Sequence, residues 1–183
     1  QVLRRWIKKA PRGGWVFTSN VDGQFQKAGF DAHRVVECHG SIHRLQCTAC
    51  DAASWSAEAL TPEVDDAACR WLGALPACPH CGALARPNIL MFGDVEWQEE
   101  VTTRQAQEIE SWLCTLHRPL VIELGAGTAI PSVRRFGHRV IRERGGRLLR
   151  INPREPAPPS PRDIGLAMGA AEALAAIDVQ WLA

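Results

Sequence analysis

Short apolar runs alternate along this chain with segments in which apolar residues recur every three to four positions. Strands that alternate with helices are typical of a parallel sheet covered by helices on both faces, so we predict an α/β fold. The runs predict strands over 15–18, 34–38, 86–92, 119–124 and 147–152. The periodic segments predict helices over 1–10, 24–30, 101–116, 132–144 and 167–177.

Residues 44–85 interrupt this alternation with two Cys-x-x-Cys pairs, Cys47/Cys50 and Cys78/Cys81. Each pair places two thiolates on one tight turn, and four thiolates suit a structural zinc ion with no open coordination position. The two pairs are separated by 27 residues, more than the usual 15–20 or so. We therefore expect a helical insert from Ser54 to Leu72, with Cys69 as a buried thiol within it. Buried cysteines without a metal, or a redox pair, are the alternatives.

The composition is that of an ordinary globular protein. The chain has 183 residues, 46% of them hydrophobic and 22% charged, with a net charge of +1. These values exclude a disordered tail, a collagen-like repeat and a highly basic nucleic-acid coat. No run of about 18 apolar residues is present, so no membrane span is predicted. We expect one domain over 1–43 and 86–183 and an inserted module over 44–85.

The cysteine content points to a reducing compartment. Seven cysteines are an odd number, and close pairs with spare thiols fit a metal site in the cytoplasm better than a secreted disulfide framework. The chain opens with Gln1, which leaves an N-terminal targeting segment open.

Several polar or glycine-rich segments follow predicted strands. Ligands of open parallel sheets bind beyond the carboxyl ends of the strands, so we expect these segments to converge on one crevice. The glycine-containing turn precedes a helix and could bind a phosphate, although Ile130 stands where a third glycine of the dinucleotide pattern would be. The segments are Ser19-Asn20-Val21-Asp22, His39-Gly40, Gly125-Ala126-Gly127 and Asn152.

Each of these segments also has a purely structural interpretation. Asn20 and Asp22 could cap their own turn, and His39 could be structural. A Cys38–His39 dyad is disfavoured because adjacent strand residues point to opposite faces. Seven arginines between 134 and 150 could form a nucleic-acid patch, but we expect a solvated outer helix face and regard nucleic acid as an unlikely partner.

Taken together, the segments resemble the sirtuin family over nearly the whole chain and in family order. VFTSNVDGQFQKAGF is similar to the family's T-Q-N-[IV]-D stretch, and ECHGSIHRLQC to its H-G stretch before the first zinc cysteine. CTAC and CPHCG resemble its zinc ribbon, and RPNILMFGD resembles its R-P to F-G-[ED] stretch. VIELGAGTAIPSV and LLRINP occupy the places of its G-[TS]-S turn and I-N pair.

The resemblance implies a Rossmann-like parallel sheet with a small zinc-ribbon module, and an NAD-dependent protein-lysine deacylase. It implies that His39 is the general base for a ribose hydroxyl and that Asn20 positions the nicotinamide ribose and a water. Ser19, Val21 and Asp22 would lie at the nicotinamide end. The adenosine end would involve Gly125, Ala126, Gly127, Asn152, Gly169 and Ala170. The acyl-lysine tunnel would involve Phe92, Gly93 and Asp94, and one structural zinc would be bound by Cys47, Cys50, Cys78 and Cys81.

The implied substrates are NAD and an acyl-lysine protein or peptide, and the implied products are lysine, nicotinamide and an O-acyl-ADP-ribose. The alternatives are a sirtuin-like ADP-ribosyltransferase or NAD glycohydrolase, and a non-catalytic zinc-containing binding module. Acyl preference, protein substrate and oligomeric state do not follow from the sequence.

Three departures from the family pattern bear on these expectations. Ser19 replaces a glutamine, and the Gly125–Gly127 turn lacks the family's hydroxyls. The family's opening strand and Gly-rich phosphate loop do not occur in these 183 residues. We therefore expect the chain as given to bind NAD weakly.

Overall fold

The computed structural model describes the backbone of residues 1–182 and the side chains of residues 1–180. Its contacts divide the chain into two compact units. The first holds Gln1–Phe17, Ala32–Arg34 and the chain from Gln107 onward, and the second holds Thr18–Asp31 and Val35–Ala106. Among the described residues, every helix falls short of the length and apolar character that a membrane crossing needs. The predicted partition into 1–43 with 86–183 and 44–85 stays a prediction.

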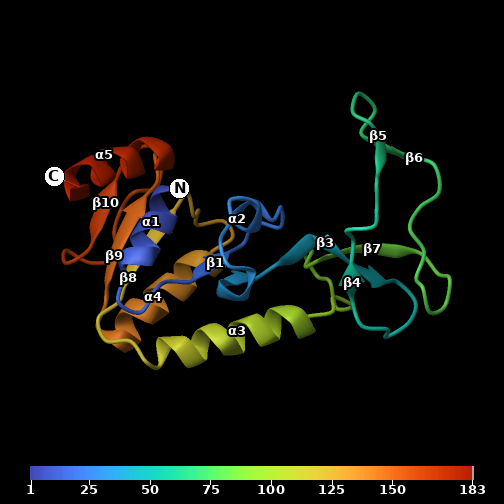
Figure 1. Ribbon diagram of the computed structural model, residues 1–183, viewed down its shortest axis with the longest axis horizontal. Helices are drawn as coiled ribbons and strands as arrows, with labels where there is room; N and C mark the ends of the chain where they lie inside the picture. Colours follow the sequence, from blue (N-terminus) through green and yellow to red (C-terminus); the bar gives the residue numbers. More distant parts are fainter. Residues whose placement is uncertain (183) are drawn as a thin grey trace. The chain divides into compact units, whose positions relative to one another are not determined.

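The first unit is built on a three-stranded parallel sheet (Figure 1). Its strands run in the order β10 (Ile164–Leu166), β9 (Arg147–Ile151) and β8 (Leu120–Leu124). This confirms the predicted parallel sheet and two of its strands. The sequence pattern missed β10, because three residues containing a glycine carry too little periodicity to be distinguished from the proline-rich residues 153–162 that precede them.

Helices complete the first unit. They are α1 (Val2–Lys9), α4 (Ser132–Arg144), α5 (Ala170–Leu182) and the C-terminal half of α3 (Glu100–Leu113). Helix α4 packs on β8 and β9 with Val140 against a core that includes Leu148 and Ile151. Helix α1 is fastened to α5 because the Trp6 indole N–H donates to Asp178 over 2.8 Å and Arg5 pairs with the same carboxylate. The last helix begins three residues later than the periodicity predicts.

The second unit is built on antiparallel strands. A sheet in the order β4 (Trp55–Ser56), β3 (Gly40–Cys47) and β7 (Ala85–Ile89) leads into the cysteine loops (Figure 1). Its interior is partly polar, since the Asn88 amide donates to Gln46 over 2.8 Å and to the Gln98 carbonyl over 3.0 Å. The short elements α2 (Gln24–Lys27) and β2 (Val35–Glu37) also belong to this unit, whereas η1 (Ala32–Arg34) belongs to the first unit and β1 (Val16–Thr18) spans the boundary between the two.

The helical insert predicted from Ser54 to Leu72 is wrong. A β-hairpin stands there, formed by β5 (Glu63–Asp65) and β6 (Arg70–Leu72), after the short strand β4. The physical reason lies in its turn, where the Asp65 carboxylate accepts from the backbone N–H of Ala67 and of Ala68, each over 3.0 Å. Such side-chain bonds compete with helix formation. Cys69 lies in this turn with φ of 50° and is exposed, so the prediction of a buried thiol is also wrong.

Candidate functional site

Four cysteine sulfurs meet in the second unit. The Sγ atoms of Cys47, Cys50, Cys78 and Cys81 all lie within 4.8 Å of one another. Cys47 and Cys81 are separated by 3.5 Å between their sulfurs, and Cys50 and Cys78 by 3.8 Å. A tetrahedral zinc ion with Zn–S bonds of about 2.3 Å requires sulfurs about 3.8 Å apart, so the residues fit this metal.

The surroundings of the cluster favour thiolates only in part. The backbone N–H groups of Ala49 and Cys50 donate to the Cys47 sulfur over 3.3 Å each. The Ala49 contact is the main reason why the pKa of the Cys47 thiol falls to about 6. The Ala52 N–H lowers the pKa of the Cys50 thiol. The neighbouring Cys47 and Cys81 sulfurs and desolvation together raise it by more, so the pKa of Cys50 is above its ordinary value. Four thiolates therefore need a cation among them.

His39 occupies the turn between β2 and β3 and is connected to two other predicted site segments by backbone hydrogen bonds. The Leu90 N–H donates to the His39 carbonyl over 2.9 Å, at the start of the segment that contains Phe92, Gly93 and Asp94. On the other side, the Ile42 N–H donates to the Val21 carbonyl over 2.9 Å. Within one unit, the structure thus brings His39 together with the Ser19–Asp22 turn and the segment after β7.

Gly40 makes this approach possible. It has φ of +79°, and a Cβ atom at this position would lie 2.0 Å from the Asn88 carbonyl oxygen. Only glycine fits such a backbone at such a distance. Cys38, on the other side of His39, has its pKa raised to about 11 by burial, which keeps the thiol neutral and argues against a Cys–His dyad.

The Ser19–Asp22 turn shows the structural interactions that the sequence left open. The Asn20 N–H donates to the Thr18 hydroxyl over 3.1 Å, and the Asp22 carboxylate accepts from the Gln24 N–H over 3.2 Å at the start of α2. The Asn20 residue is exposed, and Asp22 keeps a second carboxylate oxygen beyond this turn. Turn formation and ligand binding are therefore compatible at these residues.

Sequence reasoning missed His43 as a support of this turn. A ring nitrogen of His43 lies 3.2 Å from the Asp22 carbonyl oxygen, and the ring covers Gly23, where a Cβ atom would lie 2.6 Å from it. The glycine, which has φ of +65°, is the signal that could have shown a close contact here.

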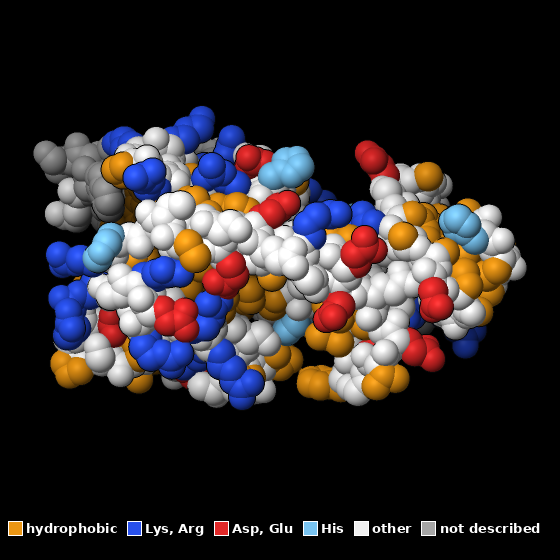
Figure 2. All heavy atoms as spheres, turned by 90° about the horizontal axis from the view of Figure 1, so that it is seen from below, with side chains coloured by type: hydrophobic (Ala, Val, Ile, Leu, Met, Phe, Trp, Pro, Cys, Tyr) orange, Lys and Arg blue, Asp and Glu red, His pale blue; other side chains and the backbone are white. Residues whose placement is uncertain are grey.

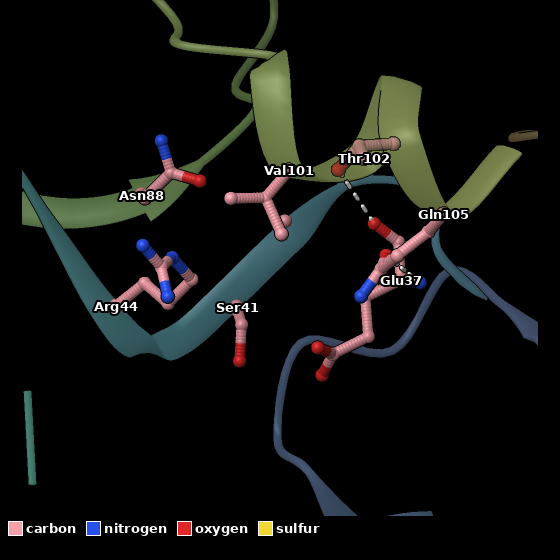
Figure 3. A pocket seen from close by; sticks show the side chains of 8 residues that line it. Glu37, Ser41, Arg44, Asn88, Val101, Thr102 and Gln105 are labelled. Atoms are coloured by element: carbon pink, nitrogen blue, oxygen red, sulfur yellow. Dashed lines mark hydrogen bonds between the residues drawn. The ribbon is translucent and has the colours of Figure 1, made fainter. Parts of the chain in front are cut away.

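A small polar pocket lies beside this region and is too small for a cofactor. It has room for about one water molecule. The Thr102 hydroxyl donates to the Glu37 carbonyl over 3.0 Å, and Gln105 accepts from the Glu37 N–H over 3.1 Å (Figure 3). Burial raises the pKa of the Glu37 carboxyl, although a hydrogen bond from Ser41 opposes this. These contacts hold the first turns of α3 against β2.

The segment after β7 is more exposed than the predicted strand over 86–92 implies. The strand ends at Ile89, and Phe92 and Val95 are 94% and 95% exposed. The Asp94 carboxylate is occupied by Arg86, whose guanidinium donates to both oxygens over 2.9 and 2.8 Å. Desolvation raises the pKa of Asp94, but the Arg86 hydrogen bond and charge outweigh it and lower that pKa. Both oxygens of the Asp94 carboxylate are therefore engaged by Arg86, so this group does not act as a free carboxylate.

The first unit holds the glycine-containing turn. Gly125–Gly127 follows β8, and both glycines are exposed. A Cβ atom at Gly125 would meet nothing within 4 Å, and one at Gly127 would meet only the Glu155 carboxylate, at 3.8 Å. Asn152, at the end of β9, donates to the Ala126 carbonyl over 3.1 Å.

The remaining predicted adenosine residues stand at another helix start. Gly169 is exposed at the beginning of α5, where its carbonyl accepts from the Ala173 N–H over 3.0 Å, and Ala170 is the first residue of that helix. The convergence predicted for all these segments stays a prediction, because they belong to different units.

The arginine-rich segment differs from its prediction as a solvated face. Arg150 has a side chain only 3% exposed and is paired with Glu123. Arg134 has a side chain 11% exposed and pairs with Glu155 over 3.0 Å. The prediction of a solvated helix face is wrong for Arg134 on α4, because Glu155 pairs with it, and Arg150, on β9 outside that helix, is neutralised by Glu123 on β8. Burial and the Arg150 charge lower the pKa of His138, which lies 2.8 Å from the Arg150 guanidinium.

Comparison with known proteins gives consistent results. Residues 1–116 match the family described as Sir2 family. An NAD-dependent protein deacylase of Pyrococcus furiosus is 30% identical over 138 residues, which are 75% of this chain and 49% of that protein. NAD-dependent protein deacylase 2 of Pseudomonas syringae pv. tomato is 30% identical over 163 residues, 88% of this chain and 58% of that protein. The chain spans about half the length of the curated relatives it matches.

Solved structures show the same fold. A crystal structure of a Sir2 homolog–NAD complex has a TM-score of 0.66 at 23% identity, over 98% of this chain and 63% of that one. A Sir2–p53 peptide–NAD+ structure has a TM-score of 0.64 at 23% identity, over 98% of this chain and 68% of that one. With the family match over residues 1–116, these findings establish that the chain belongs to the Sir2 family.

Proposed function

We propose that this chain carries NAD-dependent removal of acyl groups from lysine side chains of proteins or peptides, with nicotinamide and an O-acyl-ADP-ribose as products. The observation that carries the proposal is the connection of three segments at His39. Backbone hydrogen bonds of 2.9 Å join the His39 turn to the segment after β7, and β3 to the Ser19–Asp22 turn. The family membership and the names of the relatives support the same reaction.

His39 is assigned the role of general base. Its imidazole has a ring nitrogen that can accept a proton, as a base for a ribose hydroxyl requires, and the residue stands in the turn between β2 and β3. Asn20 would position the nicotinamide ribose and a water, and Asp22 would bind the nicotinamide amide through its second carboxylate oxygen. Ser19 and Val21 complete this part of the cosubstrate site.

The first unit is assigned the adenosine end of NAD. Neither chain packing nor a positive φ explains the glycine at 127, whereas close approach of a ligand does. Gly125 and Ala126 would lie beside the same ligand. The Asn152 amide donates one hydrogen to Ala126 and has a second hydrogen for a ribose hydroxyl. Gly169 and Ala170 are assigned a place near adenine.

The acyl-lysine substrate is assigned to the segment after β7. Phe92 and Gly93 are exposed and follow directly on a strand, so a peptide could add to this backbone as a further strand. Asp94 would contribute to substrate binding in two ways: its ion pair with Arg86 holds the segment in place, and its backbone could pair with the peptide.

The chemistry divides between cosubstrate and protein. NAD, when bound, supplies the anomeric carbon that the acyl oxygen attacks as nicotinamide departs. His39 would then accept the proton of a ribose hydroxyl at a ring nitrogen, and Asn20 would hold the water that completes deacylation. Zinc bound by Cys47, Cys50, Cys78 and Cys81 would be structural, because four thiolates leave no open position for substrate. The cysteine pattern favours the reducing cytoplasm as its location.

The test is an assay of an acetyl-lysine peptide with NAD, with O-acetyl-ADP-ribose detected by mass spectrometry. His39→Ala should reduce turnover about 10²–10⁴-fold, while His117→Ala, an exposed control, should not. Absence of the product with the unsubstituted protein would overturn the proposed activity. Retention of more than about a tenth of the turnover by His39→Ala would overturn the assignment of the base.

A further inference from the structure

The turn Gly125–Thr128 is held from inside the first unit by a side chain that no family motif contains. Arg134 lies in the first turn of α4, and its side chain extends back to the turn Gly125–Thr128. Its Nε donates to the Ala126 carbonyl oxygen over 2.9 Å, and its Nη2 donates to the Glu155 carbonyl over 2.9 Å and to the Glu155 carboxylate over 3.0 Å. Its side chain is only 11% exposed.

The Ala126 carbonyl oxygen receives two donors. Besides Arg134, the Asn152 amide donates to it over 3.1 Å, so both lone pairs of this oxygen are used. A trans peptide is planar, and its C=O and N–H point in opposite directions. A carbonyl turned toward Arg134 and Asn152 therefore turns the N–H of the next residue, Gly127, the other way.

The Gly127 N–H is available to a ligand. Gly127 is exposed, and no hydrogen bond to its N–H is found among residues 1–182. The far side of the turn is also fixed, because the Thr128 hydroxyl donates to the Glu155 carboxylate over 2.8 Å. That carboxylate is the one Arg134 holds, so a single guanidinium restrains the turn at two points.

A purely structural ion pair would not require this arrangement. Glu123, the buried carboxylate nearby, is already paired with Arg150 through two guanidinium nitrogens, and Arg134 lies 3.7 Å from it. The shortest Arg134 contacts go instead to two backbone carbonyls, those of Ala126 and Glu155. The planar fork of an arginine can serve several acceptors in fixed directions, which a lysine ammonium cannot.

We propose that Arg134 is a positioning residue for the nucleotide cosubstrate: it orients the Ala126–Gly127 peptide so that the Gly127 N–H is presented to a phosphate or ribose oxygen of an ADP-ribose group. This inference rests on the proposed function. It explains how a turn without hydroxyl side chains at 125–127 still offers a directed donor, since the direction comes from the buried side of the peptide.

The experiment compares Arg134→Gln with Arg135→Gln, the neighbouring exposed arginine, in the 183-residue chain. ADP-ribose is titrated by calorimetry and by ¹⁵N NMR, which follows the Gly127 amide directly. Loss of a charge-assisted hydrogen bond predicts about tenfold weaker binding for Arg134→Gln and no change for Arg135→Gln. The Gly127 amide should shift on binding in the unsubstituted chain and in Arg135→Gln, and much less in Arg134→Gln.

Arg134→Lys distinguishes the effect of the guanidinium geometry from the effect of the positive charge. It also replaces Arg134→Gln in the experiment if that variant does not fold. It keeps the charge beside Glu155 but cannot serve both carbonyls, so it should also weaken ADP-ribose binding while leaving the thermal unfolding temperature near that of the unsubstituted chain. If the unsubstituted chain binds ADP-ribose and the Arg134 variants bind it equally well, the positioning role is wrong and the proposed function stands. If the unsubstituted chain does not bind ADP-ribose even at millimolar concentration, both are wrong.

Discussion

The first unit buries aliphatic side chains between parallel strands and α4, with Leu148 and Ile151 each 1% exposed. In the second unit, two cysteines of the metal site, Cys47 and Cys78, are among the most buried side chains, at 5% and 3%. Most of the exposed large hydrophobic side chains also belong to this unit: Ile42, Val64, Leu72, Leu75, Leu84, Leu90, Met91, Phe92 and Val95. The second unit also buries Val35 and Val36 completely, but we expect it to depend more than the first unit on a metal ion and on polar contacts for its stability.

The surface view agrees with this difference. In Figure 2, hydrophobic side chains gather over the part of the second unit that holds the hairpin β5–β6 and the cysteine loops of residues 47–50 and 78–81. On the visible face of the first unit, lysine and arginine side chains are interspersed with acidic ones. The comparison leads to four predictions, from the largest expected effect to the smallest.

Removal of one metal ligand should have the largest effect. Cys78→Ser leaves three thiolates, so the second unit should lose several kcal/mol of stability, because metal binding to such a site is folding energy. Hydrogen exchange should show loss of protection in β3 and β7 with retention in β8 and β9, and metal analysis should show less than one zinc per chain. Cys69→Ser, in the exposed hairpin turn, is the control. Equal loss of protection in both units would contradict the comparison.

Gly40→Ala should come next. The new Cβ atom would lie 2.0 Å from the Asn88 carbonyl oxygen at a φ of +79°, so strain and overpacking add to a loss of about 2–5 kcal/mol. Gly82→Ala has a similar φ of +75° but meets nothing within 4 Å, and should cost only about 1–2 kcal/mol. Denaturant unfolding of both variants measures the difference. An equal loss of unfolding free energy in the two variants would mean that Gly40 and the Asn88 carbonyl, beside His39, are not in tight contact.

Arg86→Gln should have a smaller effect on stability and a specific one on substrate binding. It leaves the Asp94 carboxylate without the Arg86 Nη2 that donates to both of its oxygens, at a cost of about 1–2 kcal/mol for a part-buried pair. The segment carrying Phe92 should lose order, which should raise KM for an acyl-lysine peptide more than it lowers kcat. Arg104→Gln, exposed on α3, is the control. A change in kcat alone would argue that Arg86 does not act through this segment.

The smallest effect concerns pH and the first unit. Hydrogen bonds from Trp6 and Arg5 lower the pKa of Asp178 below its ordinary value of 3.8, against an opposing effect of desolvation. A lowered pKa in the folded state stabilises the fold above the unfolded pKa, and this contribution disappears as the pH falls through the folded value. The unfolding temperature of Asp178→Asn should thus be lower than that of the unsubstituted chain at pH 7 and approach it below about pH 4. Glu172→Gln, exposed on the same helix, should show no such convergence.

The elements of the first unit were the most predictable part of the fold. Helix α4 begins and ends where its periodicity predicts, and β8 and β9 lie within the predicted apolar runs. Long periodic segments can be assigned from the sequence because each buries one continuous face, which leaves a regular pattern of apolar residues. The four cysteines were equally predictable, since their spacing alone specifies two metal-binding turns.

The insert between the cysteine pairs was not predictable in the same way. Its hairpin depends on Asp65 accepting from its own turn and on cross-strand contact of Val64 with Trp71, and neither leaves a strong periodic pattern. The buried arginines were missed for a related reason. An arginine on a helix resembles a solvated residue until a carboxylate distant in sequence, such as Glu123 or Glu155, is placed beside it.

The sequence by itself determined the long helices α3 and α4, the strands β8 and β9, the metal-binding cysteines and the membership of the family, because periodicity, spacing and motif order are local properties of the chain. Only the tertiary structure decided that the Asp94 carboxylate is paired with Arg86 and that the Arg134 guanidinium donates to the Ala126 carbonyl. Both depend on the direction of one side chain relative to a backbone group, and that direction exists only after distant segments have packed together.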